Sequence, residues 1–324
     1  MSEPVRWGVL STARINQKVL DGAAGSEEVT VLAVASRSQA AAETYALERA
    51  IERAYGSYDA LLADGDVEAV YISLPNGLHV EWSIRALQAG KHVLCEKPLS
   101  RSASEVERAF AVAERSDRLL MEAFMYRHNP QIKQLKTLVE EGTIGRLRAV
   151  HASFGFHIGD QGDVRLSREL EGGSLLNVGS YCVSAARLLC GEPERALGEQ
   201  VIGGDGVDVA FAGVLRFPGE VLAHFDCGFV LDKTEELVAL GEEGNLRLAD
   251  PWHCHSAGIE LRRDGTPELI AVEAANSYRL QLENLSAAIR GGDPPLLGRA
   301  DALGQARTIE ALYTSADEHR AVTL

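Results

Sequence analysis

The first 124 residues alternate short apolar runs with longer segments whose apolar residues recur at helical spacing. Runs that are apolar on both faces, separated by helices of about 10–15 residues, are typical of βαβ units in a parallel sheet. The predicted strands are residues 5–11, 29–37, 69–75, 92–98 and 119–124. The predicted helices are residues 13–24, 39–50, 79–90 and 102–116. We therefore expect an α/β Rossmann domain with a parallel sheet over residues 1–124.

After residue 124 the pattern changes to strands of alternating polarity, joined by turns such as Pro218-Gly219 and Asp264-Gly265. Such turns between alternating runs favour an antiparallel sheet. The predicted strands are residues 146–157, 207–217, 220–230, 235–241, 244–250 and 259–273. The predicted helices are residues 129–142, 179–191, 278–292 and 300–316. We expect residues 125–324 to form a second, α+β domain with an open, mainly antiparallel sheet.

Composition and charge narrow the class of partner. The 324 residues suffice for about two domains, and the formal net charge is −15. An acidic chain is a poor match for nucleic acid or an anionic membrane surface. No apolar run reaches the ~18–20 residues of a membrane span. A small anionic ligand still fits, because backbone dipoles and a single arginine bind phosphate locally.

The cysteines and the start of the chain bear on location. The five cysteines are scattered along the chain and odd in number, which fits reduced thiols rather than a disulfide framework. The start, MSEPVRWGVL, enters a predicted strand almost at once and lacks the basic and apolar regions of a signal peptide. We therefore expect a cytoplasmic protein.

A candidate phosphate-binding loop, GVLSTARIN, joins the first strand to the first helix at residues 8–16. Rossmann folds place the pattern G-x-G-x-x-G here, so that backbone amides approach a pyrophosphate at the helix N-terminus. In this chain Ser11, Ala13 and Asn16 occupy the three glycine places. The loop therefore predicts dinucleotide binding through its position, with an ordinary strand-to-helix turn as the alternative.

The residues after the second strand bear on which dinucleotide binds. NAD-binding folds place an acidic residue there for the ribose 2′-hydroxyl. This chain has Ser36, Arg37 and Ser38 instead. A guanidinium flanked by hydroxyls attracts a 2′-phosphate, which an acid would repel. The segment favours NADP over NAD, although a solvated surface arginine is the alternative.

Five motifs occur in order along the chain: GVLSTARI, SLPNGLH, CEKP, MEAFMYR and GGSLLNVGSY. With them the chain resembles the Gfo/Idh/MocA oxidoreductases, most of all the branch with dihydrodiol, xylose and small glucose-fructose oxidoreductases. The resemblance implies a Rossmann domain followed by an open sheet domain, with the last helix or two packed near the first domain. It also implies a homodimer or homotetramer formed through the second sheet.

The resemblance further implies a set of cofactor contacts. These are Ser11, Thr12, Ala13, Arg14 and Ile15 at the pyrophosphate; Ser36, Arg37 and Ser38 at the adenosine phosphate; Leu74, Pro75, Asn76 and His79 along the ribose and nicotinamide; and Glu96, Lys97 and Arg127 where cofactor and substrate should meet. Glu96, Lys97 and Pro98 match the family's catalytic tripeptide, in which the peptide bond before proline is commonly cis.

Lys97 is the candidate for proton transfer. Ligands of open α/β sheets bind beyond the carboxyl ends of the strands, where Lys97 follows its strand. Oxidation of an alcohol needs a base for the hydroxyl proton, and reduction needs an acid. Desolvation and a positive nicotinamide ring both disfavour a charged ammonium, so Lys97 should share its proton at neutral pH. Glu96 could hold it in place; a salt-bridged lysine at a strand exit is the alternative.

Tyr181 and Asn177 are the candidates on the second domain. They are four residues apart, so a helix would present both on one face. Tyr181 could hydrogen-bond the reacting oxygen and relay its proton, unless it is only packed between domains. Relatives usually carry aspartate where this chain has Asn177, and an amide orients a hydroxyl without accepting a proton. The substitution shifts the proton chemistry to Lys97 and Tyr181.

Further polar residues are weaker candidates for the substrate pocket. Arg165 aligns with an arginine that binds substrate in some relatives, with a surface ion pair as the alternative. Tyr126 should contact substrate, and His157 and Phe154 should line the pocket from the sheet, each against plain packing. Residues 253–255 read HCH, but neighbours in a strand point to opposite faces, so we expect no metal site. The segment GGDGVD at 203–208 is expected to be only a loop.

These observations leave three functional hypotheses. The first is an NADP-dependent dehydrogenase that moves a hydride between nicotinamide and a carbohydrate, most simply at C1 of an aldose such as xylose or glucose. The second keeps NADPH and reduces a keto-sugar, which could be nucleotide-linked. The third is a non-catalytic NADP-binding regulator, motivated by Asn177 and the glycine-poor loop; retention of Lys97 and Tyr181 speaks against it.

Overall fold

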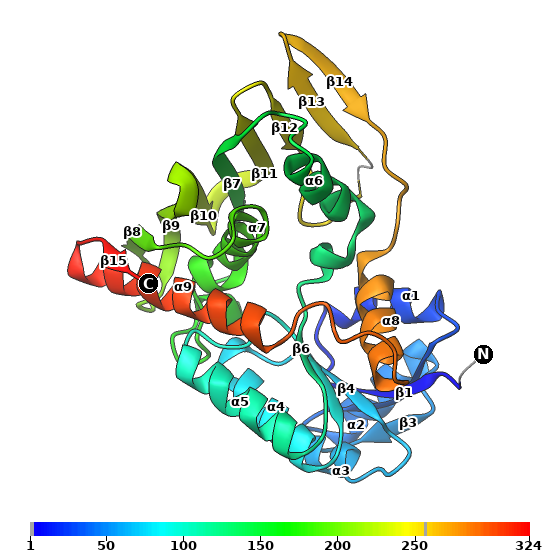
Figure 1. The fold of residues 1–324 in the computed structure, drawn as a ribbon. Coiled ribbons are helices and arrows are strands. Elements are labelled where there is room, and N and C mark those ends of the chain that lie inside the picture. The colour runs from blue at the N-terminus through cyan, green and yellow to red at the C-terminus, as the bar shows by residue number, and fades with distance from the viewer. Residues whose placement is uncertain (1–2, 256–257) are drawn as a thin grey trace. The chain divides into compact units, whose positions relative to one another are not determined.

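A six-stranded parallel sheet forms the centre of the first unit of the chain (Figure 1). In the computed structural model, which describes residues 3–255 and 258–324, this unit runs up to Ser100 and adds Ser104–Met125 and Asn276–Leu303. The strand order is β3-β2-β1-β4-β5-β6, and all neighbouring pairs are parallel. The strands are β1 Val5–Leu10, β2 Val29–Ala35, β3 Arg53–Tyr55, β4 Ala69–Ile72, β5 His92–Cys95 and β6 Leu120–Glu122.

Helices connect these strands, as the pattern of the first 124 residues predicts. The four predicted ones are α1 Asn16–Ala24, α2 Gln39–Arg49, α4 His79–Gln88 and α5 Ala103–Arg115, and a short α3, Tyr58–Leu62, is not predicted. This unit also includes α8 Ser277–Ile289 from the later part of the chain. Val9, Val34 and Val70 in the middle of the sheet are at most 1% exposed. Burial of both sheet faces explains why these strands are near-continuous apolar runs. The predicted Rossmann fold is confirmed.

One strand of this sheet carries no signal in the apolar pattern. β3 has three residues, pairs with Ala33–Ala35 of β2, and stands at the edge of the sheet. Its side chains are only half-buried, and Arg53 forms ion pairs with Asp64 and Asp66. A short, charged edge strand protects a sheet from pairing with other chains, and it leaves no apolar run to recognise.

The second unit contains a nine-stranded sheet, in the order β14-β13-β12-β11-β7-β10-β9-β8-β15 (Figure 1). Only β7 and β10 pair in parallel; the other neighbours are antiparallel, as predicted. The strands are β7 Leu147–His157, β8 Arg195–Ile202, β9 Asp208–Phe217, β10 Val221–Gly228, β11 Val230–Gly241, β12 Asn245–Leu248, β13 Ile259–Arg263, β14 Thr266–Ile270 and β15 Val322–Thr323. The helices are α6 Pro130–Glu140, α7 Ser180–Cys190 and α9 Arg299–Glu318, of which the part from Gly304 onward belongs to this unit.

The two faces of this second sheet differ in what covers them. Ala152 of β7 pairs with Phe225 and Leu237, and these three buried residues share the face on which α7 packs. On the same side, α9 is tied to β8 because Ser315 Oγ accepts a hydrogen bond from the Gly198 amide at 3.0 Å. The opposite face keeps exposed apolar side chains: Leu197, Val201, Val214, Leu222 and Leu240. We call these five residues the open-face patch.

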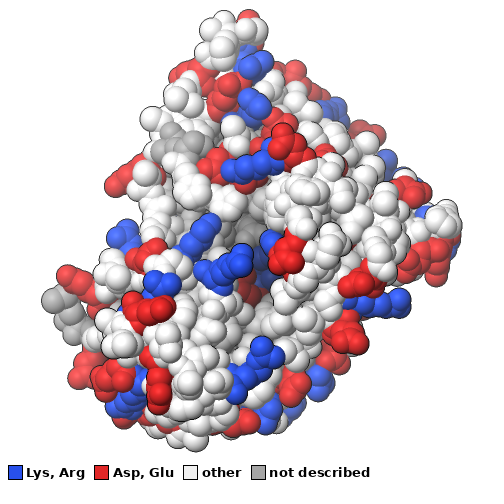
Figure 2. All heavy atoms as spheres, turned by 180° about the vertical axis from the view of Figure 1, so that it is seen from behind, with Lys and Arg blue, Asp and Glu red and all other residues white. Residues whose placement is uncertain are grey.

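On the face drawn in Figure 2, acidic and basic side chains are interspersed. Within the part of the chain that the structure describes, no helix is long and apolar enough to cross a membrane.

Candidate functional site

One row of paired residues ends the strands of the first sheet at a common level. Leu10 of β1 pairs with Ala35 of β2 and Ile72 of β4, Ile72 pairs with Cys95 of β5, and Cys95 pairs with Glu122 of β6. The segments that leave the sheet after this row therefore emerge along the same edge. Three segments with predicted cofactor contacts, and the one with Lys97, directly follow Leu10, Ala35, Ile72 and Cys95.

The loop after β1 has the form of an anion-binding turn although it lacks glycine. Ser11 has φ +117°, a conformation that normally requires glycine, and such strain is typical of functional sites. Its hydroxyl lies 2.8 Å from the Ser73 hydroxyl, which joins this loop to the segment after β4, and it accepts a hydrogen bond from the Ala13 amide. These two bonds explain how a serine is held where a glycine is expected.

Backbone donors gather at the start of α1. The Asn16 side chain donates to the Ser11 carbonyl at 2.8 Å and is fully buried, while its Oδ1 atom has no hydrogen-bond partner among the described residues. Within the described ranges, no hydrogen bond engages the amides of Thr12, Arg14 or Ile15 either. Amides at a helix start attract a phosphate, so the loop fits the pyrophosphate of a dinucleotide. Beside it lies an open pocket of about 420 Å³, lined by Thr12, Ala40, Ala41, Thr44, Tyr45 and Glu48.

The segment after β2 presents an exposed cation. The Ser36 amide donates to the Tyr55 carbonyl at 3.0 Å, which fixes the direction of the turn. Ser38 caps α2, because its Oγ accepts from the Ala41 amide, and its hydroxyl hydrogen remains able to donate. Arg37, between them, is exposed, and no described carboxylate forms an ion pair with it. The fold therefore places a guanidinium and two hydroxyls at the end of β2.

His79, which is predicted to lie along the ribose and nicotinamide, is buried between two turns of the first unit. Its ring is 1% exposed, and its nitrogens lie 2.7 Å from the Leu74 and Pro98 carbonyl oxygens. Burial lowers the pKa of His79 to about 4, so at neutral pH the ring donates one proton to one of these carbonyls. His79 thus joins the turn after β4 to the turn after β5. Leu74 is also buried, whereas Pro75 and Asn76 are half-buried.

The turn after β5 carries Glu96 and Lys97 and contains the cis peptide bond between Lys97 and Pro98. Glu96 accepts hydrogen bonds from the Tyr71 hydroxyl at 2.7 Å and from the Lys97 amide at 3.3 Å. Burial raises the pKa of the Glu96 carboxyl, and the neighbouring Lys97 opposes this shift. The buried Glu122 carboxylate accepts from the Leu99 amide at 2.8 Å. Glu96 and Glu122 thus fix the backbone on the two sides of Lys97, whose side chain is half-buried.

In the second unit, a π-helical turn precedes the helix that the pattern predicts. The turn covers Leu175–Gly179 and leads directly into α7. Such turns are frequently found at functional sites. The Asn177 side chain donates to the Gly173 carbonyl at 2.8 Å, and it is 9% exposed. The π-turn means that the simple helical spacing of Asn177 and Tyr181 does not describe their geometry.

Tyr181 stands in a cluster of aromatic rings at the start of α7. Its ring centroid lies 5.4 Å from that of Phe154, 5.7 Å from Trp252 and 5.6 Å from Tyr126. Tyr126 is fully buried and donates a hydrogen bond to the Ser184 hydroxyl at 2.8 Å, and Arg127 donates to the same oxygen at 3.2 Å. Tyr126 thus supports Tyr181 from inside the unit instead of presenting its hydroxyl to a ligand.

Two other substrate candidates lie apart from this cluster. Arg165 forms a two-pronged ion pair with Asp163, with nitrogen–oxygen distances of 2.9 and 2.6 Å, and its guanidinium lies over the Phe156 ring. This is the ion pair that the sequence leaves as the alternative. His157 is exposed at the end of β7, and strand alternation puts it on the face opposite to Phe154. The two therefore do not line one pocket from the sheet.

Asp208 is a buried residue that the sequence gives no reason to select. It is 2% exposed, and its carboxylate accepts hydrogen bonds from the Ser174 hydroxyl and the Leu175 amide, both at 2.7 Å, and from the Tyr313 hydroxyl at 2.8 Å. Burial raises the pKa of Asp208, and these hydrogen bonds oppose the shift. Asp208 therefore holds the start of the π-turn against β9 and α9. The expectation that GGDGVD is only a loop is wrong for its last residue, which begins β9.

The HCH segment also differs from its prediction, because residues 253–255 lie in a turn outside any strand. The rings of His253 and His255 are stacked, with centroids 5.4 Å apart. Glu235 and Asp250 both lie beside His253. The premise that neighbouring side chains point to opposite faces is therefore wrong here.

Comparison with known families matches both halves of the chain. Residues 5–124 match the oxidoreductase family with an NAD-binding Rossmann fold, and residues 132–247 match the GFO/IDH/MocA C-terminal domain. A curated relative, D-xylose 1-dehydrogenase (NADP(+)) 2 of Haloferax volcanii, is 37% identical over 323 residues, covering 98% of this chain and 99% of the relative.

Two solved structures are similar over nearly the whole chain. A 3-ketoreductase from Actinomadura kijaniata, in complex with NADP and TDP-benzene, has TM-score 0.91 and 33% identity, covering 96% of this chain and 98% of that one. Aldose-aldose oxidoreductase from Caulobacter crescentus, complexed with glycerol, has TM-score 0.92 and 29% identity, covering 99% and 100%. The A. kijaniata enzyme is also solved with one tyrosine replaced by Phe and with one lysine replaced by Ala or Glu.

The Asp208 network predicts a local stability effect. Asp208→Asn replaces one acceptor oxygen by a donor, so at least one of the three hydrogen bonds is lost inside the unit. We expect the free energy of unfolding, measured by urea denaturation, to fall by about 1–3 kcal/mol. Asp205→Asn, in the same loop but exposed, should change it by less than about 0.5 kcal/mol. Equal effects of the two substitutions would contradict the assigned role.

Proposed function

Because the chain belongs to the Gfo/Idh/MocA oxidoreductase family, we propose that it transfers a hydride between NADP and a sugar, most simply at C1 of an aldose such as xylose or glucose. The observation that carries the proposal is the position of Lys97, two residues beyond the paired row that ends the parallel strands. The xylose dehydrogenase from H. volcanii, similar over nearly its whole length, supports the aldose and the NADP specificity.

NADP would be held by the segments that leave the common edge of the first sheet. The amides of Thr12, Arg14 and Ile15 would bind the pyrophosphate, with Ser11 and Ala13 completing the turn. Arg37, with the hydroxyls of Ser36 and Ser38, would bind the 2′-phosphate. Pro75 and Asn76 would lie along the ribose and nicotinamide. The buried residues His79 and Leu74 would hold that segment in position. Once bound, NADP supplies the nicotinamide carbon that exchanges hydride with the substrate.

Lys97 is our candidate for the group that takes the proton from the sugar hydroxyl during oxidation and returns it during reduction. Its backbone is fixed by hydrogen bonds to Glu96 and, past the proline, to Glu122. A fixed backbone lets a flexible lysine deliver its amine to one place, and positioned acid–base groups contribute typically 10²–10⁴-fold to rate. Glu96 is held by Tyr71 and serves to orient Lys97.

In the second unit, we assign Tyr181 as a hydrogen-bonding partner of the reacting oxygen, and Asn177 and Arg127 as polar contacts. Support comes from the A. kijaniata enzyme, whose substituted lysine and tyrosine stand as far apart in sequence as Lys97 and Tyr181 do here. The aromatic cluster gives the Tyr181 ring a fixed orientation. Asn177 can orient a hydroxyl but cannot take its proton, so we assign it no acid–base role. Arg165 and His157 would act in substrate binding only if they leave their present positions.

A second candidate function is reduction of a keto-sugar with NADPH. It is favoured by the A. kijaniata 3-ketoreductase, crystallised with a thymidine nucleotide and NADP. The residues proposed above would act in the opposite direction, Lys97 as the acid. Comparison of initial rates for aldoses with NADP⁺ and for keto-sugars with NADPH ranks the two functions, and no turnover in either direction would contradict both.

We further propose that the protein is a cytoplasmic homodimer or homotetramer assembled through the open-face patch. Five apolar side chains on β8, β9, β10 and β11 form this patch, which also crosses β7, and each is at least 37% exposed. Apolar surface of this kind, concentrated on one face, is typical of association sites. The five cysteines are free thiols, which fits a reducing compartment.

Replacing Lys97 tests the catalytic proposal. Lys97→Ala should lower kcat by ~10²-fold or more and leave NADP affinity nearly unchanged, because only the proton-transfer group is lost. The rate is followed by NADPH absorbance, and the affinity by quenching of protein fluorescence. Lys136→Ala, on α6 with a side chain that is 42% exposed, is the control and should keep full activity. Near-normal turnover of Lys97→Ala would remove Lys97 from the mechanism.

Replacing Arg37 tests the cofactor assignment. Arg37→Ala should weaken NADP⁺ binding by ~10-fold or more while NAD⁺ binding changes little, since only NADP⁺ carries the 2′-phosphate that the guanidinium would pair with. Titration of both dinucleotides against wild type and variant measures the two ratios. Arg49→Ala, at the far end of α2, serves as the control. Equal losses for NADP⁺ and NAD⁺ would show that Arg37 does not read the phosphate.

A further inference from the structure

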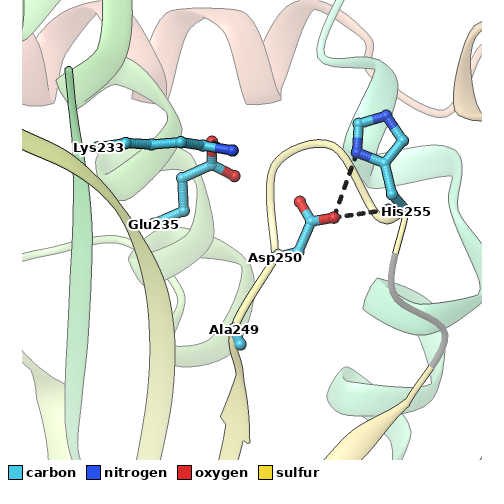
Figure 3. A pocket seen from close by; sticks show the side chains of 5 residues that line it. All are labelled: Lys233, Glu235, Ala249, Asp250 and His255. Carbon is cyan, nitrogen blue, oxygen red and sulfur yellow. Dashed lines mark hydrogen bonds and ion pairs between the residues drawn. The ribbon is translucent and has the colours of Figure 1, made fainter. Parts of the chain in front are cut away.

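A polar pocket of about 490 Å³ lies on the second unit, lined by Lys233, Glu235, Ala249, Asp250 and His255 (Figure 3). Glu235 comes from β11, while Asp250 and His255 come from the turn after β12. The residues proposed above for cofactor binding and proton transfer do not line it. It therefore calls for a separate explanation.

Metal-ligating groups converge at this pocket. One carboxylate oxygen each of Glu235 and Asp250 and one ring nitrogen of His253 all lie within 4.8 Å of one another. His253 Nδ1 is 3.0 Å from Glu235 Oε2 and 3.9 Å from Asp250 Oδ1. A fourth candidate ligand is close, because His255 Nδ1 lies 3.3 Å from Asp250 Oδ2. Among the described residues, this is the one group of three such side chains that meets so closely.

The neighbouring structure holds these ligands in place. Trp252, between Asp250 and His253, is fully buried and donates from its indole nitrogen to the Ser153 carbonyl at 3.0 Å. The amides of His253 and His255 donate to the two oxygens of Asp250 at 3.2 and 2.8 Å. Outer contacts that orient a ligand are a general feature of protein metal sites. The turn is thus shaped around Asp250 by its own backbone.

The buried carboxylate of Glu235 is a further reason to infer a bound ion at this pocket. Its side chain is 6% exposed, and it lies beside two basic residues among those described, His253 and Lys233; Lys233 Nζ is 3.5 Å from Glu235 Oε1. Lys233 is 76% exposed, so its ammonium can leave the carboxylate for solvent. The carboxylate oxygens of Glu235 and Asp250 lie within 4.8 Å of each other and repel, and a divalent ion between them would neutralise both charges.

We propose that Glu235, Asp250 and His253 bind a divalent transition-metal ion, with zinc as the representative. A mixed set of imidazole and carboxylate ligands suits zinc, whereas calcium and magnesium prefer oxygen ligands alone. The ion would bind between His253 Nδ1 and the Glu235 carboxylate and displace Lys233. His255 or water would complete the coordination from the open side of the pocket. The proposed site adjoins the aromatic cluster around Tyr181, because the His253 ring lies 6.0 Å from that of Phe154.

The experiment is a calorimetric titration of ZnCl₂ into the full chain after removal of metal with a chelator. Wild type should bind one zinc ion per chain. Glu235→Gln, Asp250→Asn and His253→Gln should each weaken binding by ~100-fold or more, since loss even of an outer contact typically costs 10–100-fold. Glu236→Gln is the matched control: the next residue on β11, it points to the opposite sheet face, beside His151.

A second measurement guards against variants that fold poorly. Zinc should raise the thermal unfolding midpoint of wild type and Glu236→Gln but not of the three ligand variants, because metal binding stabilises only the state that holds it. If one ligand variant fails to fold, the other two decide. Absence of zinc binding by wild type, unchanged affinity in the ligand variants, or loss of binding in Glu236→Gln alone would each overturn the proposed site.

Discussion

The register of the first parallel sheet is the constraint on which the whole account depends. Because Leu10, Ala35, Ile72, Cys95 and Glu122 pair across five strands, each following segment leaves the sheet at the same level. Helix starts, backbone amides and charged side chains therefore lie along one edge of the sheet, although they are far apart in the sequence. A shift of one residue in the pairing register of β5 would move each side chain at its end, including Glu96 and Lys97, to the other face of the sheet.

Buried polar residues convert this common edge into fixed positions. Ser73 holds the loop after β1, His79 joins the turns after β4 and β5, and Glu122 holds the backbone beyond Pro98. The second unit repeats the principle, since Asp208 holds the π-turn and a cluster of rings orients Tyr181. In the first unit Lys97 is half-buried and its support Glu122 is buried, whereas in the second unit Tyr181 is buried together with its supports. Removing a buried support leaves polar partners unsatisfied, which is why such positions affect both stability and function.

The sequence predicts the fold and the position of the main residues because both follow from short-range patterns. Continuous apolar runs define the central strands, and Arg37 and Lys97 stand directly after two of them. The residues that the sequence places wrongly or misses depend on long-range contacts. Asp208 is 33 residues from the amide it binds, and Glu235 is 18 residues from His253. Tyr126 and His79 are polar in sequence, but their burial can be seen only once their partners, Ser184 and the Leu74 and Pro98 carbonyls, are in place.

Amide hydrogen exchange of the full chain, with and without saturating NADP⁺, tests the central claim most directly. The account predicts that the cofactor slows exchange in the segments that follow β1, β2, β4 and β5, namely residues 11–16, 36–41, 73–79 and 96–99. The segments at the opposite edge of the same sheet, residues 25–28, 64–68 and 89–91, should exchange at unchanged rates. Protection at that opposite edge, or none at the carboxyl edge, would contradict it.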